Sequence, residues 1–200
     1  KSILGLIEVN NGEILFKNKN RNQISNSLFR KKVQLIFQDP YSSLNPEISI
    51  GNSIIEPMIA HKIFGSKYEM ECRAIELLNQ VGLSKNDYKK FPNQFSGGQR
   101  QRIVIARALA LNPEVIICDE SVSALDVSIQ AQILNLLSDL KEKYLFTFLF
   151  ISHDMSVIKY FTDRLIVLKK GKIIEINETD FLFEHSKKLY TKSLLRASDF

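Results

Sequence analysis

Short apolar runs, rich in β-branched and aromatic residues, alternate along this 200-residue chain with longer stretches of helical periodicity. Runs of this length and composition predict β-strands, most of them buried on both faces. Strands that are separated by helices favour an α/β fold, with a mostly parallel sheet flanked by helices. The expected strands are Ile14–Phe16, Val33–Phe37, Val115–Cys118, Leu145–Ile151, Leu165–Leu168 and Lys172–Ile176.

Between Phe37 and Val115 the periodicity is helical throughout, which predicts a helical insert within the α/β fold. We therefore expect one domain, with an α/β core formed by residues 1–47 and 112–176, a helical subdomain at 48–111 and a C-terminal helical segment at 177–200. Helices are expected at Ser53–His61, at Tyr68–Val81 closed by Gly82, at Gly97–Leu111, around Ile129–Leu140 and at Lys187–Ala197.

Composition excludes several classes of protein. Cys72 and Cys118 lie far apart in the sequence, so neither a disulfide framework nor a zinc cluster is expected, which fits a reducing cytoplasm. The longest apolar run, Leu145–Ile151, is too short to cross a bilayer. The net charge of +5 does not identify a nucleic-acid binder. A local basic stretch favours a solvated face over a binding patch: Lys17, Lys19, Arg21, Arg30, Lys31 and Lys32.

An acidic pair ends one of the expected strands. The apolar run from Val115 is followed directly by Asp119 and Glu120. Ligands of open parallel sheets bind beyond the carboxyl ends of strands, where Asp119 could hold a phosphate-bound Mg²⁺ and Glu120 could polarise a water. Taken alone, such a pair more often just begins a loop.

A second candidate site lies at the start of an expected helix. Ser96 suits the N-cap position, and Gly97 and Gly98 would let backbone N–H groups approach an anion closely. An ordinary Ser-Gly-Gly turn is the alternative interpretation. The order of the motifs argues against it: Ser-Gly-Gly-Gln, a basic amphipathic helix, an Asn-Pro turn and the acidic strand end follow one another closely.

These motifs, in this order, resemble those of the nucleotide-binding domain of ABC transporters. The resemblance spans nearly the whole chain. Phe95–Gln99 is similar to the Leu-Ser-Gly-Gly-Gln signature, Val115–Glu120 to Walker B, Ser123–Asp126 to the D-loop, Phe150–Asp154 to the switch-histidine segment, and Gln38 to the Q-loop glutamine.

Further stretches resemble the ATP-binding subunits of oligopeptide and dipeptide importers. They are Gln38–Pro46, Cys118–Gln132 and Leu189–Leu195. Ser121 is a departure, because the family usually has Pro there; it loosens the turn after Glu120 but removes no functional group.

The resemblance implies a RecA-like P-loop NTPase core that acts as a head-to-tail dimer and sandwiches two ATP molecules. Each chain would bind its partner's γ-phosphate through the signature residues Ser96, Gly97, Gly98 and Gln99. Glu120 would orient the attacking water, and His153 would contact the γ-phosphate. Asp119 and Gln38 would hold Mg²⁺. Asp126 would link the two sites. A histidine after a strand, considered alone, is more often structural, and Ser152 or Asp154 could cap the next helix.

The same resemblance implies partners and a location. A second cassette, transmembrane permease subunits and an extracytoplasmic peptide-binding protein are expected, and nucleic acid is not. The subunit would sit on the cytoplasmic face of the membrane, and Tyr41–Pro46 would be a loop beside the groove that receives a permease helix. Nickel and other small solutes use similar subunits, so the solute stays open.

The chain is expected to be part of a longer protein. It opens inside an apolar pattern, and no G-x-x-x-x-G-K string occurs in it. The corresponding lysine is expected about five residues before Lys1. We expect residues 1–200 alone neither to bind ATP tightly nor to hydrolyse it. Alternatives are a soluble ABC ATPase outside transport, or a non-catalytic fragment that only offers its signature helix.

Overall fold

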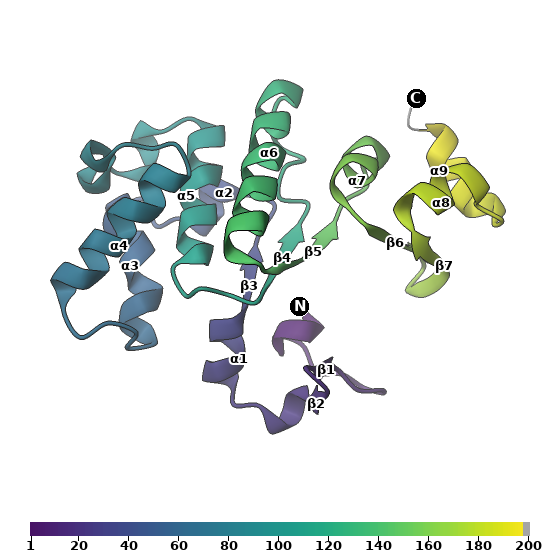
Figure 1. The fold of residues 1–200 in the computed structure, drawn as a ribbon, viewed down its shortest axis with the longest axis horizontal. Coiled ribbons are helices and arrows are strands. Elements are labelled where there is room, and N and C mark those ends of the chain that lie inside the picture. Colours follow the sequence, from purple (N-terminus) through teal and green to yellow (C-terminus); the bar gives the residue numbers. More distant parts are fainter. Residues whose placement is uncertain (198–200) are drawn as a thin grey trace. The chain divides into compact units, whose positions relative to one another are not determined.

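The computed structural model of the protein describes residues 1–197. The chain forms two compact units, Lys1–Leu149 and Phe150–Phe200, which are described separately below. Figure 1 follows the elements of both units in chain order.

A short hairpin and a helix open the first unit. β1 (Leu15–Phe16) pairs antiparallel with β2 (Lys19–Asn20). The two residues between them, Lys17 and Asn18, both have positive φ, as in a type I′ turn, whose twist suits paired strands. α1 (Asn26–Lys32) follows. The sequence did not predict β2 or α1.

The basic stretch near the N-terminus is only partly solvated. Arg21 is 7% exposed, and its guanidinium carbon lies 4.1 Å from the centroid of the Phe29 ring. Lys17 and Lys32 both form ion pairs with Glu114, and these contacts lower the pKa of that carboxyl. The expectation of a solvated basic face is therefore wrong for Arg21, because its neighbours bury its side chain.

A three-stranded sheet in the order β3-β4-β5 carries the strand ends on which the site depends. β3 (Val33–Ile36) is parallel to β4 (Val115–Asp119), which is buried at its three central residues. β5 (Thr147–Ile151) instead alternates between exposed and half-buried residues. The expectation of burial on both faces is wrong for β5.

The stretch between β3 and β4 is helical, as the sequence predicted. α3 (Ile50–Ala60), α4 (Lys67–Gln80) and α5 (Gly97–Leu109) pack against one another (Figure 1). Each fully buried aliphatic side chain contributes about 1.5–3 kcal/mol, so these helices form a stable apolar core. Fully buried members of this core include Ile54, Met58, Leu77, Leu78, Ile105 and Leu109.

Local chemistry sets the limits of these helices. The Ser66 hydroxyl accepts from the Glu69 amide and the Glu69 carboxylate accepts from Ser66, which makes a capping box at the start of α4. Gly82, just after α4, has φ +76°, which favours glycine. 3-10 turns lie at Ser2–Leu4, Arg21–Gln23, Lys85–Lys89 and Pro92–Gln94.

A short helix replaces the loop expected at Tyr41–Pro46. α2 (Pro40–Ser43) begins where the Asp39 carboxylate accepts hydrogen bonds from the first backbone amides of the helix. Proline suits the first turn of a helix because its missing N–H would have no partner there. The expectation of a loop is therefore wrong for Tyr41–Ser43.

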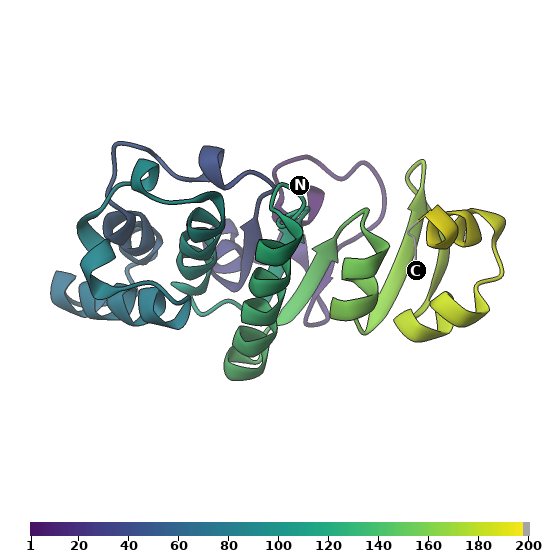
Figure 2. The ribbon, with the colours of Figure 1, turned by 90° about the horizontal axis from the view of Figure 1, so that it is seen from above.

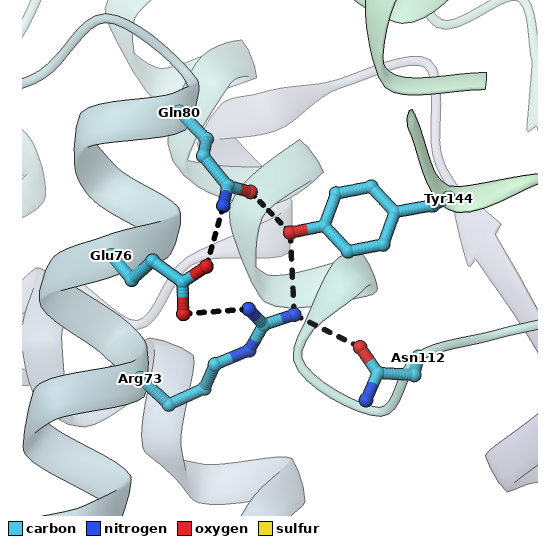
Figure 3. Close-up of polar contacts among 5 residues, drawn as sticks. All are labelled: Arg73, Glu76, Gln80, Asn112 and Tyr144. Carbon is cyan, nitrogen blue, oxygen red and sulfur yellow. Dashed lines mark hydrogen bonds and ion pairs between the residues drawn. The ribbon is translucent and has the colours of Figure 1, made fainter. Parts of the chain in front are cut away.

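α6 (Val127–Tyr144) lies beside α5 in both views (Figures 1 and 2). Its last residue belongs to a group of polar side chains that we call the Tyr144 cluster. The members, drawn in Figure 3, are Arg73, Glu76, Gln80, Asn112 and Tyr144.

Hydrogen bonds close the Tyr144 cluster on itself. Arg73 donates to Glu76 at 2.8 Å, to Asn112 at 2.9 Å and to Tyr144 at 3.3 Å. Tyr144 donates to Gln80, which donates to Glu76 at 2.8 Å. The cluster therefore joins α4, the turn after α5 and the end of α6 (Figure 3).

Over its described residues, 150–197, the second unit contains three helices and an antiparallel strand pair. α7 (Met155–Phe161) precedes β6 (Arg164–Lys169) and β7 (Lys172–Glu178). α8 (Thr179–His185) and α9 (Leu189–Ala197) follow. Much of β6 and β7 is exposed, so burial on both faces is wrong for these strands too. The apolar core of this unit consists of Met155, Ile158, Leu165, Val167 and Leu182.

None of the helices within residues 1–197 combines the length and the apolar character that crossing a bilayer requires. The longest apolar run of the sequence mainly forms β5. The division into a core, a helical subdomain and a C-terminal segment stays a prediction.

Candidate functional site

The carboxyl ends of two parallel strands bring Gln38 and the acidic pair to the same edge of the sheet. Ile36 on β3 is paired with Cys118 on β4. Gln38 comes two residues after Ile36, and Glu120 comes two residues after Cys118, so both lie just beyond the paired ends of their strands. Parallel sheets place ligands at such an edge.

Glu120 has an unusual backbone conformation. Its φ is +49°, in the left-handed region that favours glycine. A non-glycine residue held there costs on the order of 1 kcal/mol and persists only where its surroundings fix it. The adjacent turn contains a hydrogen bond from the Ser123 hydroxyl to the Glu120 carbonyl at 2.9 Å. This bond helps to hold the turn after β4.

The same Ser123 hydroxyl accepts a hydrogen bond from the Gln38 side-chain amide at 3.5 Å. The structure thus joins the segment after β3 to the segment after β4 through one serine. Gln38 and Ser123 are both exposed, and Glu120 is half-buried. Sequence reasoning missed Ser123 as a link, because no local pattern relates residues 85 positions apart.

Two buried residues flank the acidic pair in the sequence. Cys118 is fully buried, and this burial raises the pKa of its thiol to about 12. Ser121 is 2% exposed, and its hydroxyl lies beside the same thiol. A thiol is only a weak hydrogen-bond acceptor, so the serine at this position gains little from its polarity.

The start of α5 is capped as the sequence predicted. The Ser96 hydroxyl accepts from the Gln99 amide at 3.3 Å, and the Gln99 side-chain oxygen accepts from the Ser96 amide at 3.0 Å. The first N–H groups of a helix have no intrahelical acceptors. The capping box provides an acceptor, the Ser96 hydroxyl, for the backbone N–H of Gln99. The Gln99 side-chain oxygen in turn accepts from the Ser96 amide.

The two glycines at this helix start differ. A methyl group at Gly98 would lie 2.6 Å from Ile129 Cγ2 on α6, whereas one at Gly97 would lie 3.7 Å from Leu125 Cδ2. Gly98 is therefore needed for the close approach of α6. The sequence suggested only the approach of an anion.

Asp126 begins α6. It is exposed and makes no side-chain capping bond to the first turn of the helix. A carboxylate at a helix N-terminus is favoured by the helix dipole even without such a bond.

His153 belongs to the second unit and is exposed. Next to it, the Asp154 carboxylate accepts from the amides of Ser156 at 2.9 Å and Val157 at 3.3 Å. Asp154 therefore caps α7, which was one of the two interpretations left open by the sequence. The role of His153 stays a prediction.

Comparison with known proteins identifies the family. A family profile described as ABC transporter matches residues 1–123, more than half of the chain. The chain belongs to the ABC transporter family. The predicted resemblance is thereby confirmed.

Curated ABC transporter relatives match almost all of the chain. The oligopeptide transport ATP-binding protein OppF of Bacillus subtilis is 49% identical over 98% of this chain and 66% of its own length. The glutathione import ATP-binding protein GsiA of Pectobacterium atrosepticum is 46% identical over 98% of this chain and 32% of its own. The chain thus spans about two thirds and about one third of these relatives.

Solved ABC structures support the fold. The ATP-binding cassette MJ0796, described as a dimer in a post-hydrolysis state with ADP and Pi, is 32% identical with a TM-score of 0.76, over 89% of this chain and 78% of its own. CbiO1 from Clostridium perfringens has a TM-score of 0.79 at 24% identity, over 92% and 72%. The predicted α/β fold with a RecA-like P-loop core is confirmed.

The residues at the sheet edge also fit the metal that this family implies. Asp119 and Gln38 supply a carboxylate and an amide oxygen, which are ligands that Mg²⁺ accepts. Within residues 1–197 no group of three or more His, Cys, Asp and Glu side chains could hold a metal. Mg²⁺ needs only one or two protein ligands when water and phosphate supply the rest.

Proposed function

We propose that this chain is the ATP-binding and ATP-hydrolysing part of an importer for oligopeptides or dipeptides. The observation that carries the proposal is the contact of Gln38 with Ser123 beside Glu120, in a chain 49% identical to an oligopeptide transport ATP-binding protein. Another relative is named for glutathione, itself a short peptide. Both names support a peptide as the solute.

In this proposal Glu120 polarises the water that attacks the γ-phosphate, and its half-buried carboxylate lies at the strand end where substrate would sit. Asp119 and Gln38 hold Mg²⁺, which neutralises phosphate charge when bound. His153 contacts the γ-phosphate. Residues 1–47 and 112–176 act as the catalytic core.

The helical subdomain, residues 48–111, supplies the signature to a second cassette. Its binding residues are Ser96, Gly97, Gly98 and Gln99. Their suitability rests on the start of α5, where the helix dipole and the N–H groups of the first turn favour an anion. Asp126, the N-cap residue of α6, is exposed and makes no side-chain capping bond. In this proposal it links the two nucleotide sites of the dimer.

A groove on α3 is the surface proposed for the permease. Its volume is about 500 Å³ and its lining is mainly apolar. An amphipathic helix fits such a groove by burying its apolar face. The chain would then sit on the cytoplasmic face of the membrane, and a peptide-binding protein would deliver the solute from outside. The groove is lined by Ile48, Asn52, Ile55, Glu56, Ile59 and Ala60.

Replacing Glu120 with glutamine tests the proposal in the assembled transporter. A positioned general base contributes about 10²–10⁴-fold, so E120Q should lower ATP turnover by at least about 100-fold while ATP still binds. Steady-state turnover and equilibrium ATP binding are the two measurements. Glu142, exposed on α6, gives the matched control E142Q, which should keep wild-type turnover. Turnover by E120Q at the wild-type rate would refute the proposal.

A further inference from the structure

Gln101, on α5, is a polar residue that the fold buries almost completely. It is 1% exposed, and among the residues that the structure describes neither the nitrogen nor the oxygen of its side-chain amide finds a hydrogen-bond partner. A buried amide without partners has lost its bonds to water and gained none in return, so it makes folding less favourable. An apolar side chain of the same length would avoid this loss. The fold of a single chain therefore gives no reason for a glutamine at this position.

The helical spacing of α5 places Gln101 beside the start of α6. Residues three and four positions apart share one face of a helix, so Gln101 lies on the face of Gly97 and Gly98. A methyl group added at these glycines would lie 3.7 Å from Leu125 and 2.6 Å from Ile129. Side chains of a helix lean toward its N-terminus. The Gln101 carboxamide is thus directed toward the residues just before α6 and toward the first turn of α6.

The residues just before α6, which we call the Leu125 segment (121–126), contain another buried polar side chain. The Ser121 hydroxyl is buried and, among the described residues, has only the weakly accepting thiol of Cys118 beside it. At the end of the segment, Asp126 is exposed and makes no side-chain capping bond. A buried amide and a buried hydroxyl that both lack strong partners therefore lie in neighbouring segments of the first unit.

We propose that Gln101 is a positioning residue whose carboxamide forms hydrogen bonds to the Leu125 segment when ATP brings a second cassette against Asp126. The inference rests on the proposed function, because it takes the complex of two cassettes as the bound state. In that state the carboxamide oxygen accepts from a backbone N–H or from the Ser121 hydroxyl, and the carboxamide nitrogen donates to a backbone carbonyl. Bonds that are absent before binding then favour the bound position of Asp126.

Methionine at this position tests whether the amide is unpaired in the nucleotide-free protein. Q101M keeps an unbranched side chain of similar length and removes both polar atoms. In the full-length subunit without nucleotide, the equilibrium constant of unfolding should fall by about fivefold or more, measured by denaturant unfolding. An unchanged or larger constant would overturn the inference, because the amide would then already have partners before binding.

Gln80 provides the matched control. Its side-chain amide donates to Glu76 at 2.8 Å and accepts from Tyr144, so both of its polar atoms are paired. Q80M makes the same chemical change but leaves these partners unsatisfied, and it should raise the equilibrium constant of unfolding by about fivefold or more. The two substitutions should therefore change stability in opposite directions. Destabilisation by both would contradict the inference.

Hydrogen exchange in the assembled transporter tests the positioning directly. E120Q serves as the background, because it should bind ATP without turning it over. Saturating ATP should slow exchange of the backbone amides of residues 122–126, and the addition of Q101M should reduce this slowing by about fivefold or more. The addition of Q80M should leave the slowing unchanged. Equal slowing by ATP with and without Q101M would overturn the inference.

Steady-state kinetics separates positioning from a structural role. Q101M should lower kcat by about fivefold or more in a protein that is more stable than the wild type, a combination that a purely structural residue would not give. Wild-type kcat in Q101M would contradict the inference. A wild-type transporter without ATP turnover would count against the proposed function, whereas the unfolding and exchange measurements would still decide the role of Gln101.

Discussion

The two ends of α6 are held in different ways. At the C-terminal end, Tyr144 is part of the closed cluster that joins α4, the turn after α5 and α6 (Figure 3). At the N-terminal end, Asp126 makes no side-chain capping bond, and the contact with α5 is the close approach of Ile129 to Gly98. Polar bonds fix one end, and steric fit places the other.

This difference suggests how one helix can serve both stability and function. α6 has 18 residues, so its two ends lie about 27 Å apart. The end with many hydrogen bonds lies in the cluster of Figure 3, which contains no candidate site residue. At the other end, Asp126 makes no side-chain capping bond, and we propose that its carboxylate serves a ligand or a partner chain. The following predictions test this division, starting with the largest effect.

Gly98→Ala should disturb the N-terminal end most. The added methyl group would lie 2.6 Å from Ile129 Cγ2, close to the α6 backbone, so the helices must move apart. Overpacking of this kind costs typically about 1–3 kcal/mol, and we expect about 2 kcal/mol in the free energy of unfolding. Denaturant unfolding measures the loss.

Gly97→Ala is the matched control for that change. Its methyl group would lie at an ordinary 3.7 Å from Leu125 Cδ2, and alanine favours a helix over glycine. Stability should stay the same or rise slightly. Equal destabilisation by the two substitutions would show that fit against Ile129 does not place this end of α6.

Arg73→Met should weaken the C-terminal end by about 2 kcal/mol, because it leaves Asn112, Tyr144 and Glu76 without their shared donor. Tyr144→Phe removes one hydroxyl and should cost about 1 kcal/mol. Both should leave ATP turnover close to the wild type. A large loss of turnover at full stability would break the proposed division between the ends.

The Tyr144 cluster should also make the free energy of unfolding depend on pH in the acidic range. The Arg73 hydrogen bond lowers the pKa of the Glu76 carboxyl below its usual 4.5. A lowered carboxyl pKa stabilises the fold above the unfolded value, and this contribution is lost as the pH falls through 4.5 toward the folded value. The free energy of unfolding, measured from denaturant curves across this pH range, should therefore change less with pH in Arg73→Met than in the wild type.

Asp126→Ala should lower stability only slightly. With no side-chain capping bond to lose, the cost should stay below about 0.5 kcal/mol, whereas Ser96→Ala, which breaks the capping box of α5, should cost about 1 kcal/mol. ATP turnover should nevertheless fall in Asp126→Ala. Equal costs for both substitutions, measured by thermal unfolding, would show that the Asp126 side chain caps α6.

Local patterns predicted the elements that carry the candidate site. The apolar runs located β3 and β4, and the Ser-Gly-Gly-Gln sequence located the start of α5 and its cap. These features depend on neighbours within a few residues, where propensity and capping chemistry act. For the same reason the strand-end position of Asp119 was predictable.

Features that depend on distant residues were not predictable from local patterns. Arg21 is buried by its packing on Phe29, and the exposure of β5 depends on what packs against the sheet. The bond from Arg73 to Tyr144 joins positions 71 residues apart. A solvent-exposed arginine and a buried one look the same in a sequence, because only the tertiary contacts differ.

The two cysteines differ in exposure, so one of them can be labelled selectively for spectroscopy. With its thiol pKa raised to about 12, Cys118 stays protonated at neutral pH and buried from reagents, whereas Cys72 on α4 is exposed. Alkylating reagents attack the thiolate, so a maleimide dye should label the native chain at one position. That dye would report on the surroundings of α4 without any engineered residue.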